Sequence, residues 1–376
     1  MTFDKIPKIQ GIQFFYDPGY LSNKSLYDRL LEIFRALFIA SSGQVDALFE
    51  WMNELDKRFN IFEPNYGLPD FIEELKRNGY LKEGIDPEIH YSPTKKLELD
   101  LRKNAFESIF GKLRKGLPGK HKLKKSGIGE EASDSLKPFE YGDLFQNIQA
   151  FESVKNAFIN HGSKSFRIEE SDLISKESIH ESQCSTVLMI DISHSMILYG
   201  EDRISPAKKV ALALAEMIHR YYPKDKLDFV VFGDEAWQIE LKDIPYLEVG
   251  PYHTNTVAGL NLALELLNKR KSSNKHIMMI TDGKPSCIKR GKELYKNSFG
   301  LDRFIVSRTL AVARKCRKQK IDLTTFMVAS DPYLVEFVEH FSKEANGKAM
   351  YTNLEGLGEH ILINYENNKR KNGSKR

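Results

Sequence analysis

The sequence predicts an α/β protein: a doubly wound, mostly parallel sheet with helices on both faces, preceded by an α-helical N-terminal region. Two observations predict this fold. Up to about residue 105, apolar residues recur at the three- and four-residue spacing of amphipathic helices. From Ser185 onward, short apolar runs alternate with helical patterns, which is typical of parallel sheets. The first run, Thr186–Asp191, is continuous rather than alternating, as expected for a strand covered on both faces.

Four helices are predicted in the N-terminal region. Ser25 can cap the first one, because serine is a favoured N-cap residue. The second helix follows Gly43, and the third begins near Pro69 and stops at Gly79. The fourth is expected around Leu97–Leu113. Their apolar faces must be buried against each other or against the second domain.

The α/β region is expected to alternate strands and helices to its end. In chain order, the predicted elements are the strand Thr186–Asp191, a helix from about Pro206 to Tyr221, the strands Leu227–Phe232 and Trp237–Leu241, the helix Thr256–Lys269, the strand Ile277–Thr281, the helix Ser307–Gln319, the strand Leu323–Ala329, the helix Pro332–Glu344 and the strand Ala349–Thr352. The third strand should run antiparallel to the second.

Changes in composition divide the chain into five segments. They are an α-helical region (1–111), a basic Gly/Lys-rich connector (112–138), a helical lead-in (139–182), the α/β domain (183–365) and a basic tail (366–376). Charge runs that contain glycine seldom fold into a core, so the connector is interpreted as a solvated linker. The alternative is a docking loop for an acidic surface or a phosphate.

Composition argues against several classes of function. The 56 lysines and arginines exceed the 52 aspartates and glutamates by only four, so a nucleic-acid binder is not indicated. The cysteines Cys184, Cys287 and Cys316 are scattered, which argues against disulfides and zinc and favours a reducing compartment. The N-terminus lacks the pattern of a signal peptide, and no stretch approaches the ~20 apolar residues of a membrane span. We therefore expect a cytoplasmic protein.

Side chains with hard oxygen donors lie at two predicted strand ends and in one loop. Asp191, Ser193 and Ser195 end the first strand, Thr254 precedes the central helix, and Asp282 follows the strand Ile277–Thr281. Alternate residues of an extended segment point the same way, and ligands of parallel sheets bind at the carboxyl ends of strands. One such serine is easily explained as a turn or cap residue, but five donors together are not. Oxygen donors suit Mg²⁺, or Mn²⁺ with similar preferences.

This D-x-S-x-S, followed by a threonine and by T-D-G, resembles the metal-ion-dependent adhesion site (MIDAS) of the von Willebrand factor type A (vWA) family over residues 183–365. The resemblance implies a Rossmann-like fold. It also implies that Ser193 and Ser195 bind the ion directly, that Thr254 binds directly or through water, and that Asp191 and Asp282 act mainly through water. Family members complete the ion's shell with an acidic residue of a protein partner.

The turn before the threonine departs from the family pattern. Tyr252 and His253 precede Thr254, where the family often has two glycines. His194 and His253 flank the site, but they occupy the x positions of their motifs and are expected to point away from it. Both are interpreted as ordinary surface or core histidines.

Four further segments extend the resemblance. Thr186–Asp191, Pro206–Val210 and Phe326–Val335, together with Lys137–Asp143, resemble a bacterial cytoplasmic subgroup related to the D-type subunit of magnesium chelatase. Proteins of this kind act with AAA+ ATPases, so the resemblance implies a chelatase-type AAA+ ATPase as partner. The chain has no G-x-x-x-x-G-K-[ST] sequence for ATP, so the partner would supply nucleotide energy.

The leading hypothesis is a metal-dependent adaptor that binds an acidic residue of an AAA+ ATPase or its client. One alternative is a non-ATPase subunit of a metal chelatase-like complex, and another is an RNA-binding vWA protein that uses the basic segments. An autonomous enzyme is disfavoured, because a hydrolase needs a general base and both site carboxylates would be committed to the ion. No catalytic residue and no membrane partner is predicted.

Overall fold

The computed structural model describes most of the chain, in two compact units. The described residues are 8–9, 12–13, 24–84, 90–110, 131–140, 145–162, 166–179, 183–200, 202–272, 274–291, 293–297, 299–327, 332–351, 361 and 365. The first unit contains the described residues of 1–114 and 184–365, and the second contains those of 115–183.

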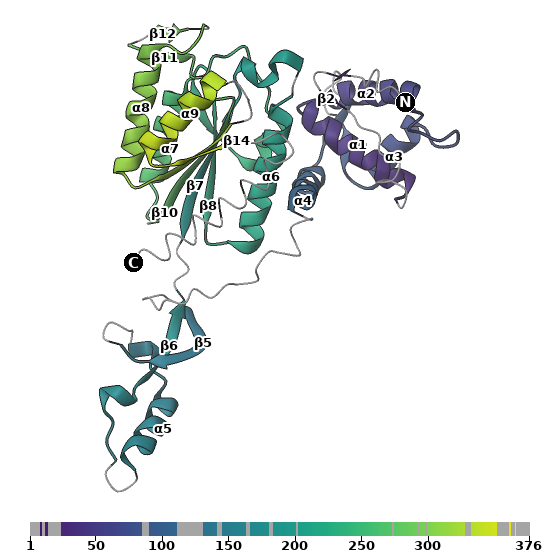
Figure 1. Ribbon diagram of the computed structural model, residues 1–376. Helices are drawn as coiled ribbons and strands as arrows, with labels where there is room; N and C mark the ends of the chain where they lie inside the picture. The colour runs from purple at the N-terminus through teal and green to yellow at the C-terminus, as the bar shows by residue number, and fades with distance from the viewer. Residues whose placement is uncertain are drawn as a thin grey trace. The chain divides into compact units, whose positions relative to one another are not determined.

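A six-stranded sheet forms the centre of the first unit (Figure 1). Its strand order is β14-β13-β10-β7-β8-β9, and every neighbouring pair is parallel except β8 and β9. The strands are β7 (Cys184–Asp191), β8 (Lys226–Phe232), β9 (Ala236–Ile239), β10 (Asn274–Thr281), β13 (Asp322–Met327) and β14 (Lys348–Tyr351). The chain builds outward from β7 to β9, returns beside β7 as β10, and then builds the other half. The strand order therefore reverses between β7 and β10.

Helices cover both faces of this sheet. They are α6 (Ile204–Tyr221), α7 (Thr256–Asn268), α8 (Arg303–Lys318) and α9 (Pro332–Ala345). Figure 1 shows α7, α8 and α9 on one side of the strands and α6 on the other. All eight residues of β7 are buried, and Val187 and Met189 join the core under α7 to α9. This arrangement confirms the predicted doubly wound α/β fold.

The predicted elements of the α/β region are present, with two differences. Helix α8 begins four residues before the predicted start, because the Asp302 side chain accepts hydrogen bonds from Phe304 N (2.9 Å) and Ile305 N (3.0 Å). An antiparallel hairpin that was not predicted, β11 (Cys287–Arg290) with β12 (Glu293–Lys296), lies between β10 and α8. The last predicted residues of the strands ending at 329 and 352 lie outside the described residues.

The N-terminal part of the first unit is helical, as predicted. It contains the short pair β1 (Lys8–Ile9) and β2 (Ile12–Gln13), then α1 (Leu26–Ala40), α2 (Val45–Phe59), α3 (Leu68–Arg77), the short strands β3 (Leu81–Glu83) and β4 (Tyr91–Pro93), and α4 (Lys95–Phe110). Ser25 caps α1 as expected, because its Oγ accepts a hydrogen bond from Asp28 N at 3.1 Å. Among the described helices, none is long and apolar enough to cross a membrane.

A buried lysine joins this helical part to the sheet domain. Lys208, on α6, is fully buried, and its Nζ donates to Ile39 O (3.0 Å), Ser42 Oγ (2.9 Å) and Pro245 O (3.3 Å). Burial lowers the pKa of Lys208 to about 8, so the amine is still protonated at neutral pH. Its three N–H groups then match three acceptors from three segments of the chain.

The turn between α1 and α2 (residues 41–44) lies directly on the segment 241–248. Gly43 has φ +82°, and a Cβ there would be 2.4 Å from Cδ1 of the Tyr246 ring, so only glycine fits. The Tyr246 ring also makes an edge contact with Phe38, with centroids 5.9 Å apart. Ser42 Oγ is 2.8 Å from Leu247 O. The helical part is therefore fixed to the same stretch of chain that continues toward Thr254.

Helix α4 lies along α6 at a second contact. Glu216 on α6 is buried and forms ion pairs with Arg102 of α4 and with Arg220, one turn further along α6. The Arg220 guanidinium lies 4.9 Å from the centroid of the Phe106 ring of α4, and that ring is 6.2 Å from the ring of Tyr221. A buried carboxylate with two guanidinium partners and an aromatic contact makes this a specific interface.

The second unit is built on a pair of strands that was not predicted. β5 (Glu131–Pro138) pairs antiparallel with β6 (Ile174–Ile179), and α5 (Ala150–His161) lies between them in the chain. The sequence places residues 131–138 in the connector and 174–179 in a helical lead-in, because neither polar stretch shows the alternation of a strand. The remaining connector residues 112–130 and the tail 366–376 lie outside the described residues.

Candidate metal centre

The predicted site residues meet at the point where the strand order reverses. Asp191 is the last residue of β7, and Asp282 follows the last residue of β10. Thr254 lies in the loop before α7, where its N–H donates to Ser286 Oγ (2.9 Å) and its carbonyl accepts from Ser286 N (3.0 Å). The chain just after Asp282 thus holds the threonine loop in place. Sequence reasoning did not identify Ser286, and no motif marked it.

Three hydroxyl groups lie together at this edge, with that of Ser193 in contact with the other two. Ser193 Oγ lies 3.0 Å from Ser195 Oγ, and Thr254 Oγ1 donates to Ser193 Oγ at 2.9 Å. Ser193 and Thr254 are almost completely buried, while Ser195 is partly exposed. The cluster therefore opens toward solvent on the side of Ser195.

Two buried carboxylates lie beside the hydroxyl groups. Asp191 accepts hydrogen bonds from Ser193 N (2.9 Å) and from Thr281 Oγ1 (2.6 Å), and Asp282 accepts one from Lys284 N (3.3 Å). Burial, together with the negative charge of Asp282, raises the pKa of Asp191 above its ordinary value. A divalent cation at this place would relieve both the repulsion and the cost of burying the charges.

The donor set fits a hard divalent ion. It consists of hydroxyl and carboxylate oxygens, which Mg²⁺ and Mn²⁺ prefer over nitrogen or sulfur. Adjacent ligands of an octahedral ion with ~2.1 Å bonds lie about 3 Å apart, and the hydroxyl oxygens are 2.9 and 3.0 Å apart. In the described part of the chain, no group of three or more His, Cys, Asp or Glu suits a metal. A metal at this edge would therefore depend on the serine and threonine hydroxyls.

The unusual turn before Thr254 has a steric explanation. The Tyr252 side chain packs against two glycines that a larger residue could not replace. A Cβ at Gly250 would be 2.1 Å from Tyr252 Cε2, and one at Gly233 would be 2.7 Å from Tyr252 Cβ. His194 N donates to Tyr252 O at 3.0 Å, which ties the serine loop to the same turn. The turn itself lacks the two glycines of the family pattern, but Gly233 and Gly250, which lie against Tyr252, leave room for its side chain.

Gly250→Ala is expected to destabilise the protein by about 1–3 kcal/mol, the usual cost of adding atoms to a filled site. The added methyl group would collide with the Tyr252 ring. Urea unfolding of the full chain measures the change. Gly67→Ala is the control, because its Cβ would meet nothing closer than Pro69 Cδ at 3.5 Å. Equal stability of the two variants would contradict the steric role of Gly250.

The two histidines beside the site have separate surroundings. His194 is exposed. His253 N donates to Asp234 Oδ1 at 2.7 Å, and its ring Nδ1 lies 3.5 Å from the same carboxylate. Asp234 also forms a 2.8 Å ion pair with Lys296 of β12, so it connects the threonine loop to the hairpin.

A sequence model described as "Rv0959-like protein, vWA domain" matches residues 184–366, which carry the sheet and all five candidate ligands. The chain contains a vWA domain. A second model, "Rv0959-like protein, third domain", matches residues 131–178 in the second compact unit. The uncharacterized protein Rv0959 of Mycobacterium tuberculosis is 24% identical over 307 residues, covering 79% of this chain and 45% of the relative. Mb0984 of Mycobacterium bovis matches to the same extent. The chain therefore spans less than half of the curated relatives that it matches.

Several solved structures are similar to the vWA domain. The vWF domain of the type V pili tip protein Mfa5 from Porphyromonas gingivalis has a TM-score of 0.40 and 12% identity, covering 49% of this chain and 95% of that one. The SpRpn10 VWA domain has a TM-score of 0.36 and 14% identity, with the same coverages. The PilB minor pilin from Streptococcus sanguinis has a TM-score of 0.40 and 12% identity, covering 53% and 64%.

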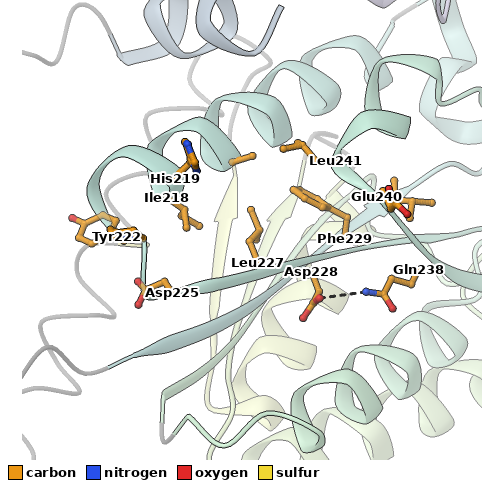
Figure 2. Close-up of a pocket in the computed structure, with 13 residues that line it drawn as sticks. Ile218, His219, Tyr222, Asp225, Leu227, Asp228, Phe229, Gln238, Glu240 and Leu241 are labelled. Atoms are coloured by element: carbon orange, nitrogen blue, oxygen red, sulfur yellow. Dashed lines mark hydrogen bonds between the residues drawn. The ribbon is translucent and has the colours of Figure 1, made fainter. Parts of the chain in front are cut away.

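The vWA domain also has a cavity of about 510 Å³ away from the metal centre. It lies between the end of α6 and strands β8 and β9 (Figure 2). Figure 2 shows Leu227 and Phe229 directed toward α6, whereas Asp228 points the other way and accepts a hydrogen bond from Gln238 at 3.3 Å. Because β8 begins at Lys226 and ends beside Asp191, the cavity is at the opposite end of the strand from the candidate ligands.

Proposed function

We propose that this vWA domain is a metal-ion-dependent protein-binding module. Its MIDAS-type site would hold Mg²⁺ or Mn²⁺ through Ser193, Ser195 and Thr254, with Asp191 and Asp282 acting mainly through water. The observation that carries the proposal is the pair of contacts that Ser193 Oγ makes with Ser195 Oγ and Thr254 Oγ1, beside two buried carboxylates at the switch point of the sheet. vWA domains are often used in protein–protein interactions, which agrees with this assignment.

The charge of the donor set favours an acidic ligand. Two carboxylates balance the charge of a divalent ion, but the neutral hydroxyl groups leave it electrophilic. The ion would supply Lewis acidity toward one further oxygen ligand. Ser195 is the most exposed of the three hydroxyl residues, so a partner's glutamate or aspartate would approach from its side.

We further propose a chelatase-type AAA+ ATPase, or its client, as the partner. The support is the sequence resemblance of segments such as Pro206–Val210 to the bacterial chelatase-related subgroup. The chain would be a non-catalytic adaptor in the cytoplasm, since its two site carboxylates would be committed to the ion rather than free as general bases. The three cysteines are buried and are not joined in disulfides, which agrees with a reducing compartment. The comparisons give no support to the RNA-binding alternative.

Affinity capture from native cell extract tests this proposal. The full chain is used with Mg²⁺, with a chelator, and as the Ser193→Ala/Ser195→Ala variant. An AAA+ ATPase is expected only in the first sample, because the other two lack the ion. Recovery of the same proteins in all three samples would show that the metal centre is not the docking surface.

A further inference from the structure

A basic and aromatic surface borders the metal centre. It is formed by the β11–β12 hairpin and the first turns of α8, which Figure 1 shows together at the same end of the domain. Between residues 284 and 308, the described basic side chains are Lys284, Lys289, Arg290, Lys296, Arg303 and Arg308, and the described acidic ones are Glu293 and Asp302. The surface is therefore positively charged, although the chain as a whole is almost neutral.

The Phe304 ring on this surface contacts two arginines and a tyrosine. We name the four residues the Phe304 cluster: Arg290, Tyr295, Phe304 and Arg308. The guanidinium carbons of Arg290 and Arg308 lie 5.8 and 5.3 Å from the centroid of the Phe304 ring. The ring of Tyr295 meets Phe304 edge-on at 5.9 Å. Neither arginine forms an ion pair with any residue that the structure describes. A guanidinium that lies over a ring in a cation–π contact still has N–H donors available for an acceptor.

The Phe304 cluster is connected to the metal centre through the hairpin. At its base, Cys287 N donates to Thr254 O (3.3 Å), and Lys296 is paired with Asp234 at 2.8 Å. Strand β11 runs from Cys287 to Arg290, which covers roughly 10 Å at the usual rise of a β-strand. The backbone of Arg290 therefore lies about that far along the strand from the residue that contacts the threonine loop, and Arg308 contacts the same Phe304 ring as Arg290.

We propose that the Phe304 cluster is a second docking site, in which Arg290 and Arg308 bind a carboxylate of the same partner segment whose first carboxylate reaches the metal. This inference rests on the proposed function of the metal centre. The partner is then an extended acidic protein segment with two acidic residues about three to five positions apart, since an extended chain covers ~3.3 Å per residue. Arginine suits this role because its planar fork matches a carboxylate.

The surrounding charges favour a protein segment over a nucleic acid. Glu293 on the hairpin is exposed, and Glu235, whose side chain is 79% exposed, lies 3.9 Å from Lys289. These carboxylates interrupt the positive surface and would repel a continuous phosphate backbone. A segment with two separated carboxylates can avoid them. The exposed Phe299, at 89% relative accessibility, offers it an apolar contact.

The test uses two fluorescent peptides and the full chain in the presence of Mg²⁺. One serine-rich peptide carries two glutamates about four residues apart, and the other has glutamine in place of the second glutamate. By fluorescence anisotropy, the first is expected to bind the wild-type protein about five- to tenfold more tightly, as a well-formed charge-assisted pair gives. Arg290→Ala/Arg308→Ala should remove this advantage and leave the affinity for the second peptide unchanged.

Arg317→Ala is the matched control, because Arg317 is exposed at the far end of the same helix. It should keep the full difference between the peptides. Equal affinities of the two peptides for the wild-type protein, or a difference that survives Arg290→Ala/Arg308→Ala, would overturn the second docking site. So would tighter binding of a single-stranded RNA oligonucleotide than of the two-glutamate peptide. Failure of the metal function has a different signature, in which a chelator leaves the affinity of both peptides unchanged.

Discussion

Replacing Ser193 and Ser195 together with alanine is expected to abolish the stabilisation that Mg²⁺ or Mn²⁺ gives to the wild-type protein. A ligand at a hundredfold excess over its Kd stabilises the folded state by about 2.7 kcal/mol. The double variant removes two of the three hydroxyl oxygens, including Ser193 Oγ, which lies 3.0 Å from Ser195 Oγ and 2.9 Å from Thr254 Oγ1. Urea unfolding with the metal ion or with a chelator measures the difference. Ser307→Ala, on the exposed face of α8, should respond to metal like the wild type.

Asp282→Asn is a more stringent test of the metal centre, because its effect on stability should have opposite signs without and with the metal ion. Without metal, the variant should be more stable than the wild type by about 1–2 kcal/mol, since it removes a negative charge beside the buried Asp191. With metal, it should gain little, because the ion loses a carboxylate. A purely structural role for Asp282 predicts a loss of stability in both conditions. That outcome would count against a metal centre.

Replacing Lys208 with methionine should destabilise the full chain by about 2–4 kcal/mol. The methionine fills the volume but leaves Pro245 O without its buried donor and Ile39 O with only the 3.4 Å hydrogen bond from Ser42 N, and an unsatisfied buried group costs about 1–3 kcal/mol. Because Ile39 is in the last turn of α1 and Pro245 belongs to the sheet domain, the contact between those two parts should loosen first. Hydrogen exchange of the amides in the α1–α2 turn would report this loosening alongside urea unfolding.

Lys269→Met provides the comparison for Lys208. Lys269 directly follows α7 in the same domain, but its side chain is 67% exposed and, among the residues that the structure describes, it is paired only with Glu265. Substitutions at such surface positions usually change stability by less than ~0.5 kcal/mol. If the two methionine variants unfold at the same urea concentration, the three contacts of Lys208 do not stabilise the protein.

The sheet was predictable because the local sequence of its strands, a short run of apolar residues, is enough to identify them. Runs such as Leu227–Phe232 are too apolar to be anything but buried, and alternation with helical patterns leaves few topologies. The β11–β12 hairpin escaped prediction because its strands are four residues long and mix charged with apolar residues. Strand pairing with so little hydrophobic content depends on its neighbours, in this case Thr254 and Asp234, which are distant in sequence.

The candidate ligands were recognisable because a short motif places them at strand ends. The residues that position these ligands were not recognisable, because each is an ordinary residue whose role depends on a contact with a residue distant in the sequence. Ser286 holds Thr254 across 32 positions, and Gly250 makes room for Tyr252 only after the loop has folded. Lys208 illustrates the same limit, since lysine is seldom buried and nothing in its local sequence identifies Ile39 as a partner.

The contact of α4 with α6 has a practical meaning for anyone who divides this protein into pieces. A cut at residue 184, where the vWA match begins, would leave Glu216 in the retained fragment and discard Arg102, one of its two cationic partners. It would also uncover the face of α6 against which the Phe106 ring lies. The stretch that is inherited as a recognisable module is thus smaller than the stretch that folds together. A fragment that begins before α1 keeps the whole folding unit, whereas one that begins at β7 keeps only the region that matches the vWA family.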